Sequence, residues 1–179
     1  MNRTSLFIIS ILVGTFMVWQ APGSLAFAKL RIGMGAEIQA DPESILAIEN
    51  TFNRAEEAIG SGNLQALMQI YSDHYRYKNF TKKDMKKIWK DFFEKYHRIA
   101  TRHSFSRIVV KTGKHPTAEV TCTGSLWATT NESDQRVNLA SWLGDVHYLV
   151  FEEGAWRIKG QGRKAPNPSH FGQSPPPLF

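Results

Sequence analysis

A helix, a glycine-containing turn and a second helix are encoded in residues 42–71, PESILAIENTFNRAEEAIGSGNLQALMQIY. Asp41 is a favourable N-cap for the first helix. Apolar residues then recur at spacings of three and four, which places them on one helical face: Ile45, Ile48, Phe52, Ala55 and Ile59. Gly60 and Gly62 end this helix, and Asn63 caps a short second one. We therefore expect a helical pair at the start of the folded domain.

A third helix with a basic outer face is predicted over residues 81–100. Thr81, with Asp84 three residues later, is a helix-start signal. Apolar side chains fall on one side of this helix: Met85, Ile88, Trp89, Phe92, Tyr96 and Ile99. The opposite side carries a set that we call the lysine stripe: Lys83, Lys86, Lys87 and Lys90. The stripe predicts weak attraction to an anionic surface or an acidic partner, and the alternative is a solvated helix face without a partner.

After Arg102 the apolar period changes to two, which indicates strands. The predicted strands are 104–112, 118–130, 136–152 and 155–160. The third would be about 55 Å long if straight, so Gly144 predicts a bulge that bends it. Three helices followed by a long, bent antiparallel meander is an α+β order. We expect the helices to cover one face of a strongly curved antiparallel sheet, which forms a cone-shaped α+β barrel with an internal hollow.

Three of these segments resemble one known superfamily, the nuclear transport factor 2-like cone fold, which includes SnoaL-like and ketosteroid-isomerase-like proteins. They are the helical pair around Gly60-Ser61-Gly62-Asn63-Leu64, the amphipathic third helix, and the ending Gly154-Ala155-Trp156-Arg157-Ile158. The last is similar to the family's final-strand motif G-x-W-[RK]-I. The resemblance covers residues 42–162 and implies the cone fold. Enzymes of the family transfer protons inside the cone, but none of their catalytic constellations aligns with this sequence.

The ends of the chain differ in composition from the predicted domain at 41–162. Arg3, an uncharged run from Leu6 to Trp19 and the site Ala26-Phe27-Ala28 have the order of a secretory signal peptide. We expect cleavage after Ala28 and an exported mature protein, with an uncleaved membrane anchor as the alternative. Residues 29–40 are predicted to be a loose leader, and the proline-rich residues 163–179 a disordered tail.

Composition and motifs exclude several classes of function. The 179 residues carry 22 Lys plus Arg and 16 Asp plus Glu, and this net charge of +6 is too small to indicate a nucleic-acid binder. Cys122 is the single cysteine, so no internal disulfide can form, and a buried apolar role is expected for it. No phosphate-binding loop, nucleophile elbow or metal-ligand spacing occurs. We expect neither a metal nor a cofactor.

The best acid–base pair in the sequence is Asp145 and His147, which lie two apart on a predicted strand and so share a face. Because a bulge at Gly144 would reverse which side chains point inward, the sequence does not decide whether this face is the inner or the outer one. In one register Trp142, Val146 and Tyr148 point inward, and in the other Asp145 and His147 join Trp142 in the hollow. Proton transfer needs the second register, and a surface Asp with a histidine on the sheet face is the alternative.

Four aromatic residues come from elements that surround the expected hollow: Tyr77, Trp89, Trp142 and Tyr148. They predict an apolar pocket with polar tips, and the alternative is that their rings fill the core. Three functions follow in order. The first is an exported ligand-binding or accessory domain without catalysis. The second is a small isomerase, dehydratase or cyclase that uses Asp145 and His147, and the third is a membrane-tethered assembly protein. We also expect a homodimer through the outer sheet face, because residues 148–151 are apolar on both sides.

Overall fold

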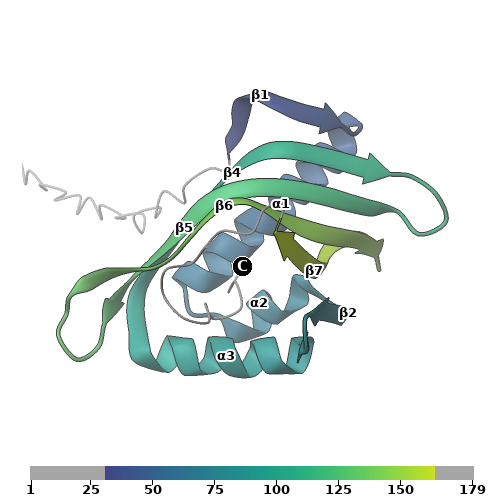
Figure 1. Cartoon of the computed structure of the whole chain (residues 1–179). Helices are drawn as coiled ribbons and strands as arrows, with labels where there is room; N and C mark the ends of the chain where they lie inside the picture. Colours follow the sequence, from purple (N-terminus) through teal and green to yellow (C-terminus); the bar gives the residue numbers. More distant parts are fainter. Residues whose placement is uncertain (1–30, 164–179) are drawn as a thin grey trace, which may run out of the picture.

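A computed structural model describes residues 31–163 as a seven-stranded mixed sheet with three helices (Figure 1). The predicted signal segment with its cleavage site, residues 29–30 of the predicted leader, and residues 164–179 of the predicted tail lie outside the described residues. The elements are β1 (Arg31–Gln39), α1 (Pro42–Gly60), α2 (Leu64–Gln69), β2 (Tyr71–Tyr77), β3 (Phe80–Thr81), α3 (Lys82–Lys95), β4 (Tyr96–Lys111), β5 (Thr117–Thr130), β6 (Arg136–Glu152) and β7 (Ala155–Arg163).

The three helices begin where their caps predict. The Asp41 side chain accepts a hydrogen bond of 2.8 Å from the backbone N–H of Ser44 at the start of α1. Asn63 caps α2 in the same way. At α3, Thr81 and Asp84 form a reciprocal capping box. Local side-chain chemistry therefore sets where each helix starts.

The expected leader is wrong at residues 31–39, which form the edge strand β1. It pairs in parallel with β4, with an irregularity in register between Ile32 and Glu37. Glu37 also forms a 3.1 Å ion pair with Arg107 of β4. Backbone pairing and this ion pair hold the segment in place. Its apolar residues do alternate in the sequence: Ile32, Met34, Ala36 and Ile38. They are exposed or half-buried and two glycines interrupt them, so the segment is held by its partner strand rather than by a buried face.

The sheet itself corrects the expected antiparallel barrel. Its strand order is β1-β4-β5-β6-β7-β2-β3, with β1 and β3 as its two ends, so the sheet is open. Two neighbouring pairs, β1 with β4 and β2 with β7, are parallel. The meander from β4 to β7 is antiparallel, as predicted.

The third helix is shorter than predicted, and the strand after it starts earlier. Helix α3 ends at Lys95, and β4 begins directly at Tyr96. Ile99 and Thr101 are buried while the residues between and beside them are exposed, which is the period of a strand. Tyr96 and Ile99 continue the helical spacing of three and four after Phe92, so periodicity alone extends the helix too far.

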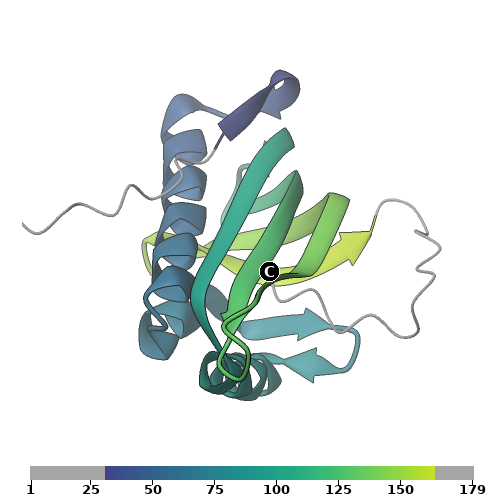
Figure 2. The ribbon, with the colours of Figure 1, turned by 90° about the vertical axis from the view of Figure 1, so that its left-hand side faces the viewer.

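Helix α1 packs against β4 and β7, and Figure 2 shows it lying beside the sheet over its whole length. The buried face of α1 includes Ile48, Phe52 and Ile59, which are completely buried. Helix α3 contacts α2, β2, β3 and the start of β4. Buried polar side chains on the side of the sheet that faces α1 therefore lie next to this helix.

Candidate functional site

The bulge in β6 selects the face on which the predicted acid–base pair lies. Gly144 has a φ of +70°, and the β5–β6 register shifts between Cys122 and Gly124 opposite it. Beyond the bulge, Asp145 and His147 are buried, as is Trp142 before it. The Phe52 ring of α1 contacts the His147 ring with 5.3 Å between centroids, so His147 faces α1. Of the two registers considered, the structure has the one that places Asp145 and His147 inward.

A second buried polar pair, Glu56 of α1 and His103 of β4, lies beside His147. Oε1 of Glu56 is 2.6 Å from Nδ1 of His103, and the two side chains are 6% and 0% exposed. The ring centroids of His103 and His147 are 6.4 Å apart. The Phe52 ring contacts both histidines, with 5.6 Å to His103. The helix and two strands therefore bring three titratable side chains together.

Burial holds this group in its neutral form near pH 7. Desolvation raises the pKa of Glu56 to about 8 and lowers the pKa of His103 to about 3. The carboxyl group is then protonated and its O–H donates to Nδ1 of His103. The ring proton of His103 consequently lies on Nε2.

Cys122 of β5 joins the group through His147. Its Sγ is 3.0 Å from Nε2 of His147, and the indole N–H of Trp142 donates to the same sulfur over 3.1 Å. Burial raises the pKa of Cys122 to about 12 and lowers the pKa of His147 to about 3, so the thiol donates to a neutral ring. Nδ1 of His147 lies 3.3 Å from the Gln161 amide of β7.

We call these residues the interior polar cluster: Glu56, His103, Cys122, Asp145 and His147. Cys122 pairs with Asp145 across β5 and β6. In the next row, His103 pairs with Gly124, and Gly124 pairs with Trp142. A Cβ at Gly124 would lie 2.3 Å from the Trp142 ring, so the missing side chain leaves room for the indole beside His103. The cluster thus combines a carboxylic acid, two neutral imidazoles, a thiol and a second carboxyl group next to aromatic walls.

The four predicted pocket aromatics do not gather in one place. Trp142 contacts His103, with 5.1 Å between the ring centroids. Trp89 is completely buried elsewhere and donates its indole N–H to the Tyr71 hydroxyl over 3.1 Å. Tyr148 is 43% exposed, and Tyr77 is half-buried beneath the Lys78 ammonium group. Of the four, only Trp142 touches the interior polar cluster through a contact seen in residues 31–163.

The lysine stripe lies on the solvent side of α3. Lys83, Lys86, Lys87 and Lys90 are all exposed, and Lys90 is 3.8 Å from Glu94. Lys82 is set apart from the stripe, because its Nζ bonds Asp73 and the Tyr71 carbonyl oxygen. The geometry of the stripe agrees with the sequence pattern, and its role stays a prediction.

Sequence reasoning missed Glu56 and His103 and assigned Cys122 only an apolar role. One signal for Glu56 is present, since it lies between Phe52 and Ile59 on the apolar face of its helix. Thr101, His103 and Phe105 occupy every second position of β4 and all three lie on its buried side. The contact between the two residues spans 47 positions, and no local pattern predicts it.

Within residues 31–163, no group of His, Cys, Asp and Glu side chains is arranged to hold a metal ion. No helix in the same range is long and apolar enough to cross a membrane.

Known structures share this arrangement of strands and helices, although no protein-family model and no curated protein matches the chain. A conserved protein from Planctomyces limnophilus is 16% identical, with a TM-score of 0.59 over 68% of this chain and 94% of its own. A ketosteroid isomerase-like protein from Erwinia carotovora is 15% identical, with a TM-score of 0.52 over 68% and 95%. A protein of unknown function from Mycobacterium tuberculosis is 13% identical, with a TM-score of 0.53 over 68% and 75%. The chain therefore has the nuclear transport factor 2-like fold, as predicted, and these low identities carry the fold alone.

Proposed function

We propose that the protein binds a small, mainly apolar molecule between α1 and the sheet, and that the interior polar cluster recognises a polar group of this ligand. The observation that carries the proposal is the 2.6 Å contact between Glu56 and His103, made by side chains that are 6% and 0% exposed. The proposed site is the wide part of a cone-shaped hollow, as the family resemblance implies.

Buried titratable groups are costly, and this cost supports a functional role. Moving a carboxyl group and an imidazole out of water disfavours folding unless good hydrogen bonds compensate. A pair of apolar side chains of similar volume would join α1 to β4 without that cost. Titratable groups whose pKa values are displaced by burial also gather at binding and catalytic sites more than elsewhere. Glu56, His103 and His147 are all buried, and burial displaces the pKa of each of them.

The surroundings of the cluster define the class of ligand. Phe52 and Trp142 supply apolar ring surface next to the histidines, and Phe105 packs against Phe52. Neutral imidazoles both donate and accept, so they fit an uncharged hydroxyl or carbonyl group better than a formal charge. A charged ligand group would also lose its hydration in this buried setting. The ligand we propose is therefore uncharged, with one hydroxyl or carbonyl group on an apolar body.

We propose that this binding takes place outside the cytoplasm. The support for this location is the order of residues 1–28, in which a short apolar run is followed by a small-residue cleavage site after Ala28. A run of 14 residues spans only about 21 Å as a helix, short of the roughly 30 Å hydrocarbon core. A membrane-anchored form is the alternative.

Fluorescence titration tests the binding proposal. The protein is titrated with a panel of uncharged ketones and phenols, and Trp142→Phe identifies the reporter ring. His103→Leu should weaken the binding of any hit about tenfold or more, because it removes a buried hydrogen-bonding group. His115→Leu is the matched control, since His115 is exposed in a turn. Equal binding by wild type and His103→Leu, or no saturable change with the whole panel, would contradict the proposal.

A second candidate function, proton transfer, is favoured by the raised pKa of Glu56, which keeps a buried proton donor beside two imidazole rings at neutral pH. At neutral pH the Glu56 carboxyl group stays protonated and can donate a proton, and the neutral ring of His147 can accept one at Nε2 once a ligand displaces the Cys122 thiol from that nitrogen. Asp145, two residues away on the same strand, is the partner group we assign to His147. This arrangement suits isomerase, dehydratase or cyclase chemistry on a ligand with an acidic C–H bond.

Deuterium exchange separates the two candidates without knowledge of the substrate. Enolisable ketones are incubated with the protein in D2O, and loss of α-protons is followed by NMR. An enzyme would accelerate the exchange, and His147→Ala would abolish the acceleration while His115→Ala would not. Binding without accelerated exchange leaves the first function and excludes proton abstraction from these ketones.

A further inference from the structure

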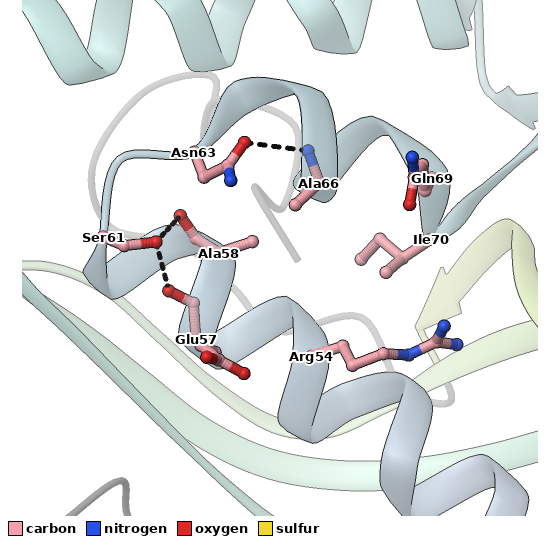
Figure 3. A pocket seen from close by; sticks show the side chains of 8 residues that line it. All are labelled: Arg54, Glu57, Ala58, Ser61, Asn63, Ala66, Gln69 and Ile70. Carbon is pink, nitrogen blue, oxygen red and sulfur yellow. Dashed lines mark hydrogen bonds between the residues drawn. The ribbon is translucent and has the colours of Figure 1, made fainter. Parts of the chain in front are cut away.

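A pocket lies on the side of α1 turned away from the interior polar cluster, between the C-terminal half of α1 and α2 (Figure 3). Its volume is about 230 Å³. Its lining combines small apolar and polar side chains: Arg54, Glu57, Ala58, Ser61, Asn63, Ala66, Gln69 and Ile70. None of these residues belongs to the interior polar cluster, so this pocket is a separate candidate site.

The turn between the two helices shapes the pocket. The Ser61 hydroxyl donates to the Glu57 carbonyl oxygen over 2.8 Å and closes the end of α1. Oδ1 of Asn63 accepts from the Ala66 backbone N–H over 3.0 Å at the start of α2. Figure 3 shows Ala58 of α1 opposite Ala66 of α2, with Ile70 at the end of α2. The two alanines and the isoleucine form an apolar floor, and polar side chains stand around it.

Two opposite charges border this floor without neutralising each other. Arg54 and Glu57 lie three residues apart on α1, and both are exposed. Among residues 31–163 neither side chain takes part in an ion pair. The Arg54 guanidinium makes one weak contact, 3.4 Å from Nη2 to the Thr51 hydroxyl oxygen. A ligand that carries both charges would bind the two side chains at once, whereas a ligand with one charge would leave one of them unmatched.

We propose that this pocket binds a free α-amino acid with an aliphatic side chain. Arg54 binds the ligand carboxylate through its paired N–H groups, and Glu57 binds the ammonium group. The aliphatic side chain lies against Ala58, Ala66 and Ile70. A volume of about 230 Å³ is below the range of roughly 300–1,000 Å³ typical of drug-sized ligands, which suits a molecule as small as leucine.

The neighbouring surface supplies a specific alternative. Arg54 and Glu57 also line a hollow of about 430 Å³ that continues along α1 to Gly154 and Trp156 at the β6–β7 turn. A longer zwitterion such as a dipeptide would extend into it. We assign the free amino acid because the apolar floor beside the two charges lies in the smaller pocket.

Calorimetric titration tests the assignment with three probes: L-leucine, N-acetyl-L-leucine without the ammonium group, and isopentylamine without the carboxylate. L-Leucine should bind, and each of the other two should bind at least about tenfold more weakly, because each loses one charge-assisted contact. Arg54→Gln and Glu57→Gln should each weaken leucine binding by a similar factor, and Arg54→Lys should weaken it less. Both positions are exposed, so these variants should fold.

Matched variants separate this site from other effects. Glu49→Gln changes a carboxylate on α1 outside the pocket and should leave leucine binding unchanged. Ala66→Leu should block the floor, and His103→Leu should have no effect because it lies in the interior polar cluster. Absence of leucine binding at millimolar concentration, equal binding of all three probes, or wild-type affinity in Arg54→Gln would overturn the proposal. Tighter binding of leucyl-leucine than of leucine would overturn the assignment of a free amino acid.

Discussion

Replacing Glu56 with glutamine should remove the fall in stability that the wild type shows as pH rises. In the folded protein burial raises the pKa of Glu56 from 4.5 to about 8. Between these values the folded state keeps a proton that the unfolded state has released, so stability falls as pH rises. A glutamine amide can donate to Nδ1 of His103 as the protonated carboxyl group does, but it does not titrate. The substitution therefore keeps the hydrogen bond and removes the linkage.

The expected size follows from proton counting. One proton of difference changes the unfolding equilibrium constant tenfold for each pH unit. The pKa values of His103 and His147 are lowered from 6.5 to about 3, so their contribution is complete above pH 6.5 and is lost as pH falls toward 3. The two histidines and Glu56 together place the maximum of stability near pH 6.5. Above pH 6.5 the unfolding equilibrium constant of the wild type should increase about tenfold per pH unit up to about pH 8, so its stability falls. The stability of Glu56→Gln should stay level over the same range.

Urea unfolding followed by circular dichroism from pH 5 to pH 9 measures this difference. Glu56→Gln should become more stable than wild type by a margin that grows with pH and stops growing near pH 8. Glu132→Gln, an exposed control, should follow the wild-type curve. Parallel pH curves for wild type and Glu56→Gln would refute the reasoning, because they would show that Glu56 is ionised in the folded protein.

Four further predictions concern the rest of the chain. N-terminal analysis of exported protein should give Lys29 as the first residue, and retention of Met1 would contradict cleavage. Changing the whole lysine stripe to glutamine should abolish salt-sensitive adsorption to anionic vesicles with little change in melting temperature, because exposed charges contribute little to stability; the idea fails if wild type does not adsorb. Light scattering at micromolar concentration should show a homodimer through the outer sheet face, and a strict monomer would exclude it. Gly124→Ala should destabilise the protein by about 1–3 kcal/mol in urea unfolding, since its Cβ would lie 2.2 Å from the Arg102 carbonyl oxygen; unchanged stability would refute that clash.

Local signals in the sequence were enough for the starts of the helices, the meander and the bend. Asp41, Thr81 and Asp84 act within a few residues of themselves, because each accepts a hydrogen bond from a backbone N–H group three residues away. Gly144 was predicted as a bulge from strand length, and its positive φ agrees. The turn at Glu153 and Gly154 has positive φ at both residues, as a tight hairpin requires.

Non-local pairing explains what local signals did not predict. The strand β1 depends on β4, about 70 residues later, and its own side chains are mostly not buried. The parallel partners β2 and β7 are equally remote in sequence. The interior polar cluster draws on one helix and three strands. Asp145 and His147 were predicted from their own strand, but the contacts that join the cluster run between elements, where no local pattern predicts them. Only Glu56, a carboxyl group on an apolar helical face, breaks the pattern of its own element.

The placement of these polar residues argues against an accident of packing. Polar side chains scattered through a core would each need a separate partner, and each would weaken a different contact. Here each of four elements, α1, β4, β5 and β6, contributes side chains to one continuous group of contacts. This group lies beside the Phe52 ring. Gly124 lacks a side chain at the position where one would displace the Trp142 ring that completes this group. A core selected for stability alone would replace the Glu56–His103 pair with apolar residues and lose nothing in the contact between α1 and β4. The free-energy cost of burying these polar groups is therefore concentrated at one site. A molecule bound at that site would gain the most from interactions with them.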